Sequence, residues 1–317
     1  MRTVRFEVAD AREAARRAAA VADGGVKGDG GLLLVTGGSR VYGAPPFIAG
    51  LAAKRAGVHG VWVAAPAVAA AGAAAALEVH LIEACDGELD EASVRAMARA
   101  SSRLVGRAAA DEARGRVVWL VGPGLGGSPV AGPVLDALVE ARRADRSAAL
   151  VVDGSLGGGE IARSRLRALG ADLVLLNRHE ARSLLPAAGS AHTGGRDGEI
   201  EAGHLAELAR EIGAVTVAKG VSDLITGGER GWVVHGGHPG LARHATGDVL
   251  AGTVAALLGQ QLPAEHAAAL GCHLLGAAGT RLVRHHGTGW LTRELIDAVG
   301  LALRALTAGA SSPAPTR

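Results

Sequence analysis

Aromatic side chains are scarce in this sequence, with four Trp, two Phe and one Tyr among 317 residues. Apolar residues nevertheless make up 49% of the chain, so Ala, Val, Leu and Ile must pack the core. The 48 glycines suffice for many tight turns. A chain of this length and composition is expected to fold around a sizeable α/β core.

Cysteine and net charge are also low. Cys85 and Cys272 lie far apart with no Cys-x-x-Cys pair, which argues against a disulfide framework and a zinc site. A formal net charge of +2 gives no reason to expect a nucleic-acid or membrane partner. The first residues lack the apolar stretch of a signal peptide, and Pro66 and Gly72 interrupt the Ala-rich run over 64–77. We therefore expect a cytoplasmic protein without a membrane span.

Short apolar, β-branched runs alternate with longer Ala/Leu/Arg patterns of helical period. The expected strands are 32–36, 61–64, 79–83, 117–121, 150–153, 173–176 and 215–218. The expected helices are 44–57, 129–143, 161–169, 201–212, 248–259, 264–284 and 291–307. Most of the strands are almost entirely apolar, which is typical of strands buried on both faces of a parallel sheet.

The alternation of strands and helices predicts a three-layer α/β/α sandwich with a mostly parallel central sheet. Residues 223–235 form two strand-like pieces around Gly-Gly-Glu-Arg, the pattern of a hairpin. No linker divides the chain, so we expect one domain over 1–308 and a disordered tail at 309–317. Further loops are expected at 22–30 and 186–200.

Two glycine-rich segments follow expected strands, where ligands bind in such folds. Segment 37–45 contains Gly-x4-Gly, but Ala-Pro follows where a P-loop needs Lys-Ser/Thr. It is either a plain strand-to-helix turn or a place where backbone N–H groups approach a ligand. Segment 122–127 satisfies Gly-x-Gly-x-x-Gly, but the acid expected for a Rossmann fold is missing, since Asp153 comes later. This segment predicts only that the backbone lies close to another group, which the sequence does not identify.

Asp248 follows Gly247 at the start of an expected apolar helix. The carboxylate is either a helix cap that complements the macrodipole or a general base for an attacking hydroxyl, and the local sequence leaves both open. Exposed N–H groups at such a helix start would bind phosphate oxygens. Lys219 and Gly220 end a strand, where the lysine is either a surface residue or faces a nucleotide.

Other polar residues carry weaker signals. His179 and Glu180 follow a strand and are either a helix-start pair or part of a polar cleft, and Asp153 closes a strand in the same way. The histidines at 285–286 lack metal-ligand spacing and are expected at the surface. Cys272 lies among apolar helical positions and is expected in the core.

The ordered set of motifs resembles the NAD(P)H-hydrate dehydratase family, a branch of the ribokinase-like fold. The matching segments are KGDGG (27–31), VTGGSRVYGAP (35–45), VGPGLG (121–126), LLNRHEARSLL (175–185), AKG (218–220), GHPGLARHATGDVLAG (237–252) and GTGWLTRELIDAV (287–299). They occur in family order and cover most of the chain. The epimerase domain that often precedes this one in the family has no counterpart in the sequence.

The resemblance implies a repair reaction on NADH or NADPH to which water has added. The new ring hydroxyl is phosphorylated with ADP or ATP, and phosphate then leaves to regenerate the dihydropyridine ring. The resemblance also suggests a homo-oligomer. Mg²⁺ is expected from nucleotide chemistry, although no residue set in the sequence identifies a metal site.

Site roles carry over from the family residue by residue, with Asp248 matching the catalytic acid. The positions that match substrate contacts are Ala44, Gly126, His179 and Asp248. The positions that match nucleotide contacts are Lys219, Gly220, Val221, Ser222, Asp223 and Gly247. The candidate phosphate contacts are Arg243, His244 and Thr246.

The sequence departs from the family before Thr-Gly-Asp, where Arg243, His244 and Ala245 replace a glycine pair. Ala245 is awkward there if its φ is positive, and the two basic residues either add charge near the phosphates or fill the site. Asp153-Gly154-Ser155 also lacks the second acid of the family's Asp-Ala-Asp. These departures leave open a non-catalytic nucleotide-binding relative, and the Gly-Asp helix start leaves open an alcohol kinase of the same fold.

Overall fold

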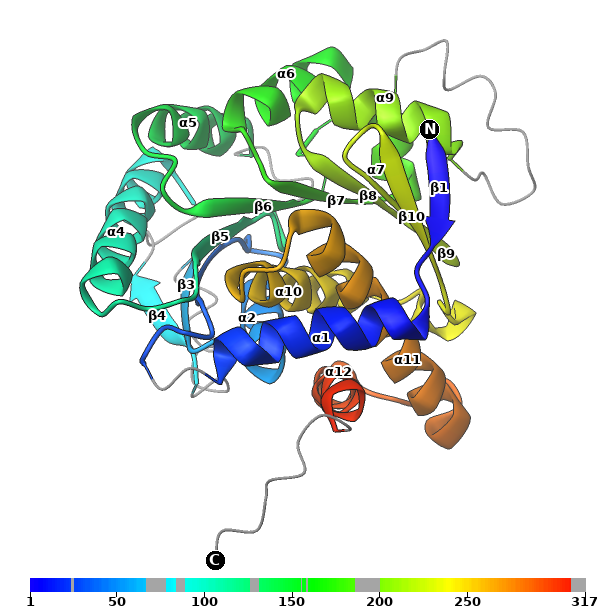
Figure 1. The fold of residues 1–317 in the computed structure, drawn as a ribbon. Helices are drawn as coiled ribbons and strands as arrows, with labels where there is room; N and C mark the ends of the chain where they lie inside the picture. Colours follow the sequence, from blue (N-terminus) through cyan, green and yellow to red (C-terminus); the bar gives the residue numbers. More distant parts are fainter. Residues whose placement is uncertain are drawn as a thin grey trace, which may run out of the picture.

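A ten-stranded sheet runs through the molecule in the order β1-β10-β9-β8-β7-β6-β5-β2-β3-β4 (Figure 1), as a computed structural model shows. The structure describes residues 1–23, 26–66, 78–83, 89–125, 131–154, 156–157, 159–185 and 200–308. The strands are β1 (Arg2–Arg5), β2 (Leu32–Thr36), β3 (Gly60–Ala65), β4 (His80–Glu83), β5 (Val117–Val121), β6 (Ala149–Asp153), β7 (Leu173–Asn177), β8 (Val215–Lys219), β9 (Ser222–Thr226) and β10 (Arg230–His235). Only β9 runs antiparallel to its neighbours β8 and β10, so the prediction of a mostly parallel sheet with one hairpin is confirmed.

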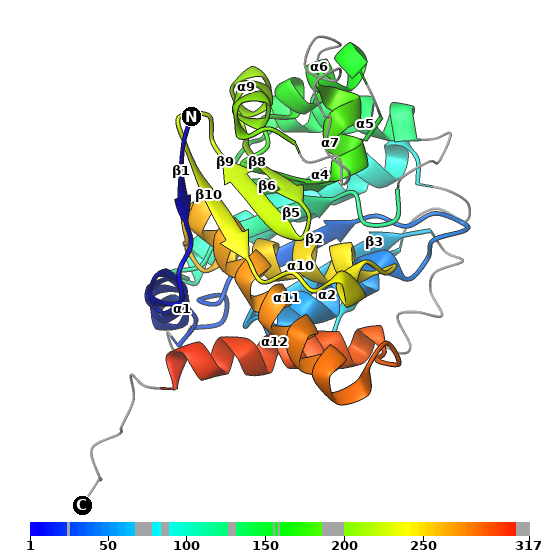
Figure 2. The same ribbon diagram turned by 90° about the vertical axis from the view of Figure 1, so that its right-hand side faces the viewer.

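Helices cover both faces of the sheet, as Figures 1 and 2 show. One face carries α1 (Val8–Ala22), α2 (Pro45–Arg55), α10 (Thr246–Gly259), α11 (Ala264–His286) and α12 (Thr292–Thr307). The other carries α4 (Glu91–Ala110), α5 (Ala131–Ala144), α6 (Gly159–Leu169), α7 (Arg178–Leu184) and α9 (Ala202–Ile212). A 3-10 turn, η2 (Pro239–Leu241), precedes α10. The predicted three-layer arrangement is confirmed.

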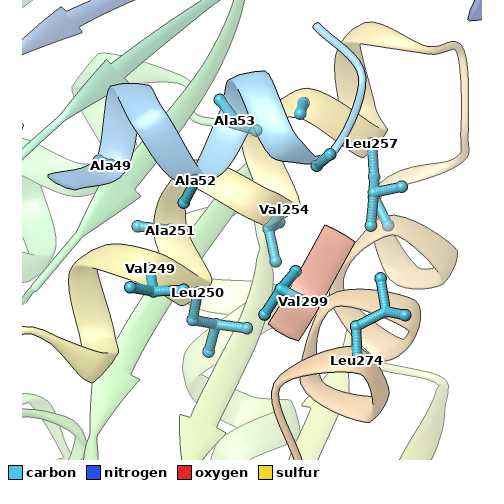
Figure 3. Packing of buried hydrophobic residues seen from close by; sticks show 14 of the residues in the cluster. Ala49, Ala52, Ala53, Val249, Leu250, Ala251, Val254, Leu257, Leu274 and Val299 are labelled. Atoms are coloured by element: carbon cyan, nitrogen blue, oxygen red, sulfur yellow. The ribbon is translucent and has the colours of Figure 1, made fainter. Parts of the chain in front are cut away.

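The central strands are apolar at every position because both of their faces are buried. Leu33 of β2 belongs to the core under α2 and α10, whereas Leu34 belongs to the core under α4 and α5. α10 packs closely on α2, where a Cβ on Gly252 would lie 1.9 Å from the Ala49 carbonyl oxygen. Figure 3 shows the small side chains at this contact, namely Ala49, Ala52 and Ala53 beside Ala251 and Val254. This packing fixes where α10 begins at the edge of the sheet.

Every expected strand and helix is present, with ends within two residues of the expectation. The sequence analysis missed β1, α1, α4 and α7. α1 buries only alanines, at positions 11, 14, 15 and 18, so its apolar stripe is weak in the sequence. β1 is exposed at all four positions and forms because it pairs with β10.

Some expectations fall outside the described residues, namely the tail at 309–317 and most of the loop at 186–200. The single-domain boundary stays a prediction. Cys272 is buried and the histidines at 285–286 are exposed, as expected. Within the described ranges, no helix is both long and apolar enough to cross a membrane.

Candidate active site

β2 and β5 lie side by side, but the chain leaves their carboxyl ends in opposite directions along the sheet, a point where open α/β sheets bind ligands. The turns after these strands touch, and the Gly38 N–H donates to the Pro123 carbonyl over 2.7 Å. A Cβ on Gly37 would lie 2.1 Å from the same oxygen, and one on Gly122 would lie 2.0 Å from the Asp153 carbonyl. These glycines therefore allow the ends of β2, β5 and β6 to meet.

Lys219 and Asp153 form an ion pair at the carboxyl ends of β8 and β6. Lys219 Nζ lies 3.0 Å from Asp153 Oδ1, and the side chains are 18% and 12% exposed. Burial disfavours the ammonium, but Asp153, Glu180 and Asp248 outweigh it and raise the pKa of Lys219. Lys219 is therefore a charged residue inside the site and not a surface lysine.

Asp248 lies in the first turn of α10, within electrostatic range of this ion pair. Burial and the negative charge of Asp153 raise its pKa to about 7, although the Lys219 ammonium opposes the shift. A helix N-terminus favours the ionised carboxylate, but burial and Asp153 outweigh that effect. A carboxyl group with a pKa near neutrality suits a general base.

The same helix position helps to separate capping from catalysis. Glu180 of α7 and Glu294 of α12 also occupy the third helical position, and each carboxylate accepts from its N-cap N–H, over 2.7 and 2.6 Å. Asp248 has no such bond to Ala245 in the described part of the chain. Asp248 is thus not engaged in a capping box, which favours a general base over a helix cap as its role.

The turn before α10 is strained. Ala245, its N-cap, has a left-handed backbone with φ of +72°, so the expectation that alanine would be awkward here is confirmed. The cost is about 1–2 kcal/mol. The Thr246 hydroxyl lies 2.8 Å from the Arg243 carbonyl and 3.0 Å from the Leu241 carbonyl. Because alanine offers no side-chain acceptor, the first N–H groups of α10 remain for acceptors such as phosphate oxygens.

Arg243 turns toward the connection between α11 and α12. Its Nη1 donates to the Thr288 carbonyl over 2.6 Å and to the Trp290 carbonyl over 3.2 Å. Its Cζ lies 4.6 Å from the centre of the Trp290 ring. His244 is exposed. Phosphate contacts from Arg243, His244 and Thr246 stay predictions, and the guanidinium of Arg243 is committed to other acceptors in this structure.

The expected nucleotide-binding residues 219–223 span the end of β8, the turn at 220–221 and the start of β9. The Gly220 N–H donates to Asp223 Oδ1 over 2.8 Å. Burial raises the pKa of Asp223 despite this bond, and the buried thiol of Cys272 contacts the same carboxyl group. Ser222 Oγ lies 2.9 Å from His235 Nδ1, and Val221 is exposed. Polar side chains at the start of β9 thus tie this segment to its own backbone, to α11 and to β10.

Gly247 belongs to the same site, because a Cβ at this position would lie 3.5 Å from Lys219 Nζ. The start of α10 and the end of β8, which are far apart in sequence, therefore meet. Ala44 is the exposed N-cap residue of α2, and His179 is exposed in the first turn of α7. Gly126, also expected to contact substrate, lies outside the described residues.

Arg178 is a site residue that the sequence analysis missed. A Cβ on Gly220 would lie 2.6 Å from Nη2 of Arg178, so the guanidinium lies against the nucleotide-binding turn. Its positive charge also lowers the pKa of Asp223 and so opposes the increase that burial causes. The available signal was its position directly after β7, beside His179.

In the ranges that the structure covers, no three His, Cys, Asp or Glu side chains converge as ligands for a metal ion. Asp153 and Asp248 provide carboxylate oxygens at the site, which are donors that Mg²⁺ accepts. Mg²⁺ usually keeps several waters and binds through one or two carboxylates together with substrate phosphates. The residues present fit that mode of binding.

Curated proteins similar to this chain point to one family. An ADP-dependent (S)-NAD(P)H-hydrate dehydratase from Xanthomonas campestris is 32% identical over 283 residues, 86% of this chain and 88% of that protein. A bifunctional NAD(P)H-hydrate repair enzyme from Pyrobaculum aerophilum is 32% identical over 279 residues, 88% of this chain. The match covers 51% of that protein, so the chain spans about half the length of this bifunctional relative.

Solved structures agree on the fold. The ADP/ATP-dependent NAD(P)H-hydrate dehydratase from Bacillus subtilis, co-crystallised with ATP/Mg²⁺ and soaked with CoA, superposes with a TM-score of 0.66 and 17% identity, covering 96% of this chain and 100% of that one. A ribokinase-like superfamily protein from Enterococcus faecalis gives a TM-score of 0.64 and 19% identity, covering 89% of each chain. The ribokinase-like fold is thereby confirmed. A family model described as NAD(P)H-hydrate dehydratase matches residues 32–300, and the chain therefore belongs to the NAD(P)H-hydrate dehydratase family.

Proposed function

We propose that this protein dehydrates hydrated NADH and NADPH in a reaction that consumes an adenine nucleotide. The observation that carries the proposal is Asp248, a carboxyl group with a pKa of about 7 in the first turn of α10. It lies beside the Lys219 ammonium, at the edge where parallel sheets bind ligands. Family membership supplies the substrate class.

Asp248 accepts the proton of the ring hydroxyl as its oxygen attacks the terminal phosphorus of the nucleotide. The bond from that phosphorus to the nucleotide then breaks, and the shortened nucleotide leaves. The ring nitrogen lone pair next expels phosphate from the carbon, and loss of a proton from the adjacent carbon restores the dihydropyridine. Phosphoryl transfer depends mainly on positioning and charge stabilisation, so a base, a cation and oriented N–H groups suffice.

The nucleotide occupies the turn of residues 219–223, with its phosphates toward Lys219 and the N–H of Gly247. A Gly247 Cβ would lie 3.5 Å from Lys219 Nζ, so these two groups can act on one phosphate chain. Ala44, Gly126 and His179 contact the hydrated dinucleotide. Both ADP and ATP appear in the names of similar proteins, and we assign either one as co-substrate.

Mg²⁺ accompanies the nucleotide in this proposal. When bound, it neutralises charge on the transferring phosphate. The carboxylate of Asp153 is the side chain that would hold it, which leaves Asp248 free to act as the base. The protein's own contribution is to orient the phosphates and to move the hydroxyl proton.

The test is to incubate the protein with hydrated NADH and either ADP or ATP and to follow absorbance in the dihydropyridine band. Recovery of absorbance that depends on nucleotide supports the proposal, and no recovery with either nucleotide contradicts it. A stable phosphorylated alcohol from a substrate screen would instead indicate a kinase. Nucleotide binding without turnover would indicate a non-catalytic relative, although the comparisons favour neither alternative.

Assembly and location belong to the same proposal. We propose a homo-oligomer in the cytoplasm that requires no nucleic-acid or membrane partner. Light scattering of the purified protein measures the first property, and a monomer at micromolar concentration would contradict it. Fractionation of cells measures the second.

A further inference from the structure

The loop that leads into α10 is fastened to α11. A Cβ on Gly276 would lie 2.8 Å from the Gly236 carbonyl, and one on Gly279 would lie 2.5 Å from the Leu241 side chain. Small residues of α11 therefore let the loop lie directly on the helix. The final residues before α10, however, extend beyond this contact, and one of their anchors is a side chain that reaches the α11–α12 connection.

That anchor is Arg243. One nitrogen of its guanidinium donates to two carbonyls of the α11–α12 connection, those of Thr288 and Trp290, over 2.6 and 3.2 Å. The guanidinium also lies over the Trp290 ring, at 4.6 Å. An arginine combines a fork of donors with a flat cationic surface, and a lysine provides neither.

Trp290 makes this anchor rigid because it is itself fixed in the core. Its side chain is 2% exposed and belongs to the apolar cluster beneath α10, α11 and α12. Five residues further on, Leu295 of α12 is fully buried in the same cluster. The guanidinium of Arg243 thus rests on a surface that cannot shift without disturbing the core.

Arg243 is coupled to Asp248 through a short stretch of strained backbone. The Arg243 carbonyl lies 2.8 Å from the Thr246 hydroxyl, in the first residue of α10. Between them, Ala245 holds a φ of +72°. A non-glycine residue stays in this region only where its surroundings impose the conformation, and the imposed strain is often found at functional sites.

We infer that Arg243 is a positioning residue: by clamping the turn at 243–246 to Trp290, it imposes the left-handed Ala245 and so aims Asp248 at the substrate hydroxyl. This inference rests on the proposed function of Asp248. Arg243, His244 and Ala245 occupy the turn where the family has a glycine pair, and glycine adopts φ > 0 without help. In this chain the clamp does what the glycines would otherwise do.

The test compares Arg243→Lys and Arg243→Ala with Arg293→Lys and Arg293→Ala. Arg293 is an exposed arginine of the first turn of α12, close in sequence to Trp290, and is a matched control. The readouts are kcat and KM for hydrated NADH and for ADP, the pH profile of kcat, the Kd of ADP by calorimetry, and amide exchange in peptides over 241–252.

A clamp predicts that both Arg243 variants lose about tenfold or more in kcat, since small misplacements of a reacting group are costly. The Kd of ADP should change by less than about twofold, and amide exchange over 241–252 should accelerate by about tenfold. The midpoint of the kcat pH profile should move, because the surroundings of Asp248 change. The Arg293 variants should match the parent protein.

A phosphate ligand predicts a different pattern. The Kd of ADP would then rise strongly in Arg243→Ala, Arg243→Lys would restore most of the binding, and amide exchange would stay as in the parent; this outcome overturns the inference. Calorimetry and amide exchange need no turnover. If the parent protein fails to repair hydrated NADH, the proposed function fails, while unchanged exchange in both Arg243 variants separately refutes the clamp.

Discussion

Two aspartates at opposite edges of the sheet show how differently this fold treats the same side chain. Asp29, before β2, is 1% exposed, and its carboxylate accepts from the Arg114 N–H at 2.7 Å and the Val26 N–H at 3.0 Å. These backbone bonds lower its pKa, outweighing burial. Asp248 is less buried, yet its pKa is raised to about 7. Backbone hydrogen bonds set the charge of Asp29, whereas burial and the neighbouring Asp153 set that of Asp248.

The backbone around Asp29 also differs from the backbone around Asp248. At the amino edge, glycines allow close contacts. A Cβ on Gly30 would lie 2.4 Å from the Gly57 carbonyl, and one on Gly115 would lie 2.3 Å from the Gly31 nitrogen. At the carboxyl edge, the left-handed position beside Asp248 is filled by Ala245. The amino edge thus holds a carboxylate fixed by backbone N–H groups, whereas the carboxyl edge holds Asp248 beside a left-handed alanine.

The largest expected contrast is in turnover. Asp248→Asn should lower kcat for hydrated NADH by about 10²–10⁴-fold, because an amide cannot accept the hydroxyl proton. The Kd of ADP, measured by calorimetry, should change little. Asp29→Asn should leave kcat per folded molecule unchanged. Equal losses in the two variants would show that Asp248 acts through stability.

Thermal stability should show the reverse contrast. Asp29→Asn turns an NH₂ group toward a backbone N–H that needs an acceptor, so Tm should fall by at least about 3 °C. Asp248→Asn removes a buried carboxylate that is repelled by Asp153, so Tm at pH 8 should rise. Differential scanning calorimetry of both variants checks this. A drop in Tm for Asp248→Asn at pH 8 would contradict the assignment of its environment.

The contributions of the two aspartates to folding stability should depend on pH with opposite signs. The folded pKa of Asp29 is lowered, so its contribution to stability is present above pH 3.8 and is lost as pH falls through the folded value. The folded pKa of Asp248 is raised, so its contribution is present below pH 3.8 and is lost as pH rises through about 7. The kcat should rise over that same upper range as Asp248 ionises. Unfolding curves from pH 3 to 9 for each Asn variant, and a kcat profile of the parent, measure these terms.

The smallest expected effect concerns the left-handed turn. Ala245→Gly should raise the free energy of unfolding by about 0.5–1 kcal/mol, because glycine adopts φ of +72° without strain. At the amino edge, Gly31→Ala should lower it by more, since φ is +86° and the Cβ would lie 2.9 Å from Gly259. Denaturant titrations compare the two. An Ala245→Gly variant less stable than the parent would show that the alanine backbone is not strained.

Much of the fold could be predicted because burial leaves a local pattern. The uniformly apolar β2 and β5 indicated a parallel sheet, and the glycines after β5 indicated a close backbone approach, which Gly122 makes to Asp153. α1 was missed because alanines alone form its buried stripe. β1 was missed because its pairing with β10 depends on residues more than two hundred positions away.

The site was only partly predictable for a related reason. Asp248 and Lys219 stood out as strand-end and helix-start residues, but the pKa of Asp248 depends on Asp153, which another strand brings near. The sequence indicated that Ala245 would be unfavourable if its φ were positive. It gave no sign of the hydrogen bonds from Arg243 to the carbonyls of Thr288 and Trp290. A pKa or a hydrogen bond that depends on a residue distant in sequence leaves no local sequence pattern.

The pairing of β1 with β10 bears on how the chain is made. β1 lies beside β10 (Figure 1), with Arg2 opposite Arg230. Phe6 packs edge-on against Trp232 with ring centroids 5.4 Å apart. At about 5–20 residues per second, a ribosome needs roughly 10–45 s to supply β10 after β1 has emerged. β1 must wait for that time as an unpaired strand, and its two arginines give it a charge that discourages pairing with another nascent chain.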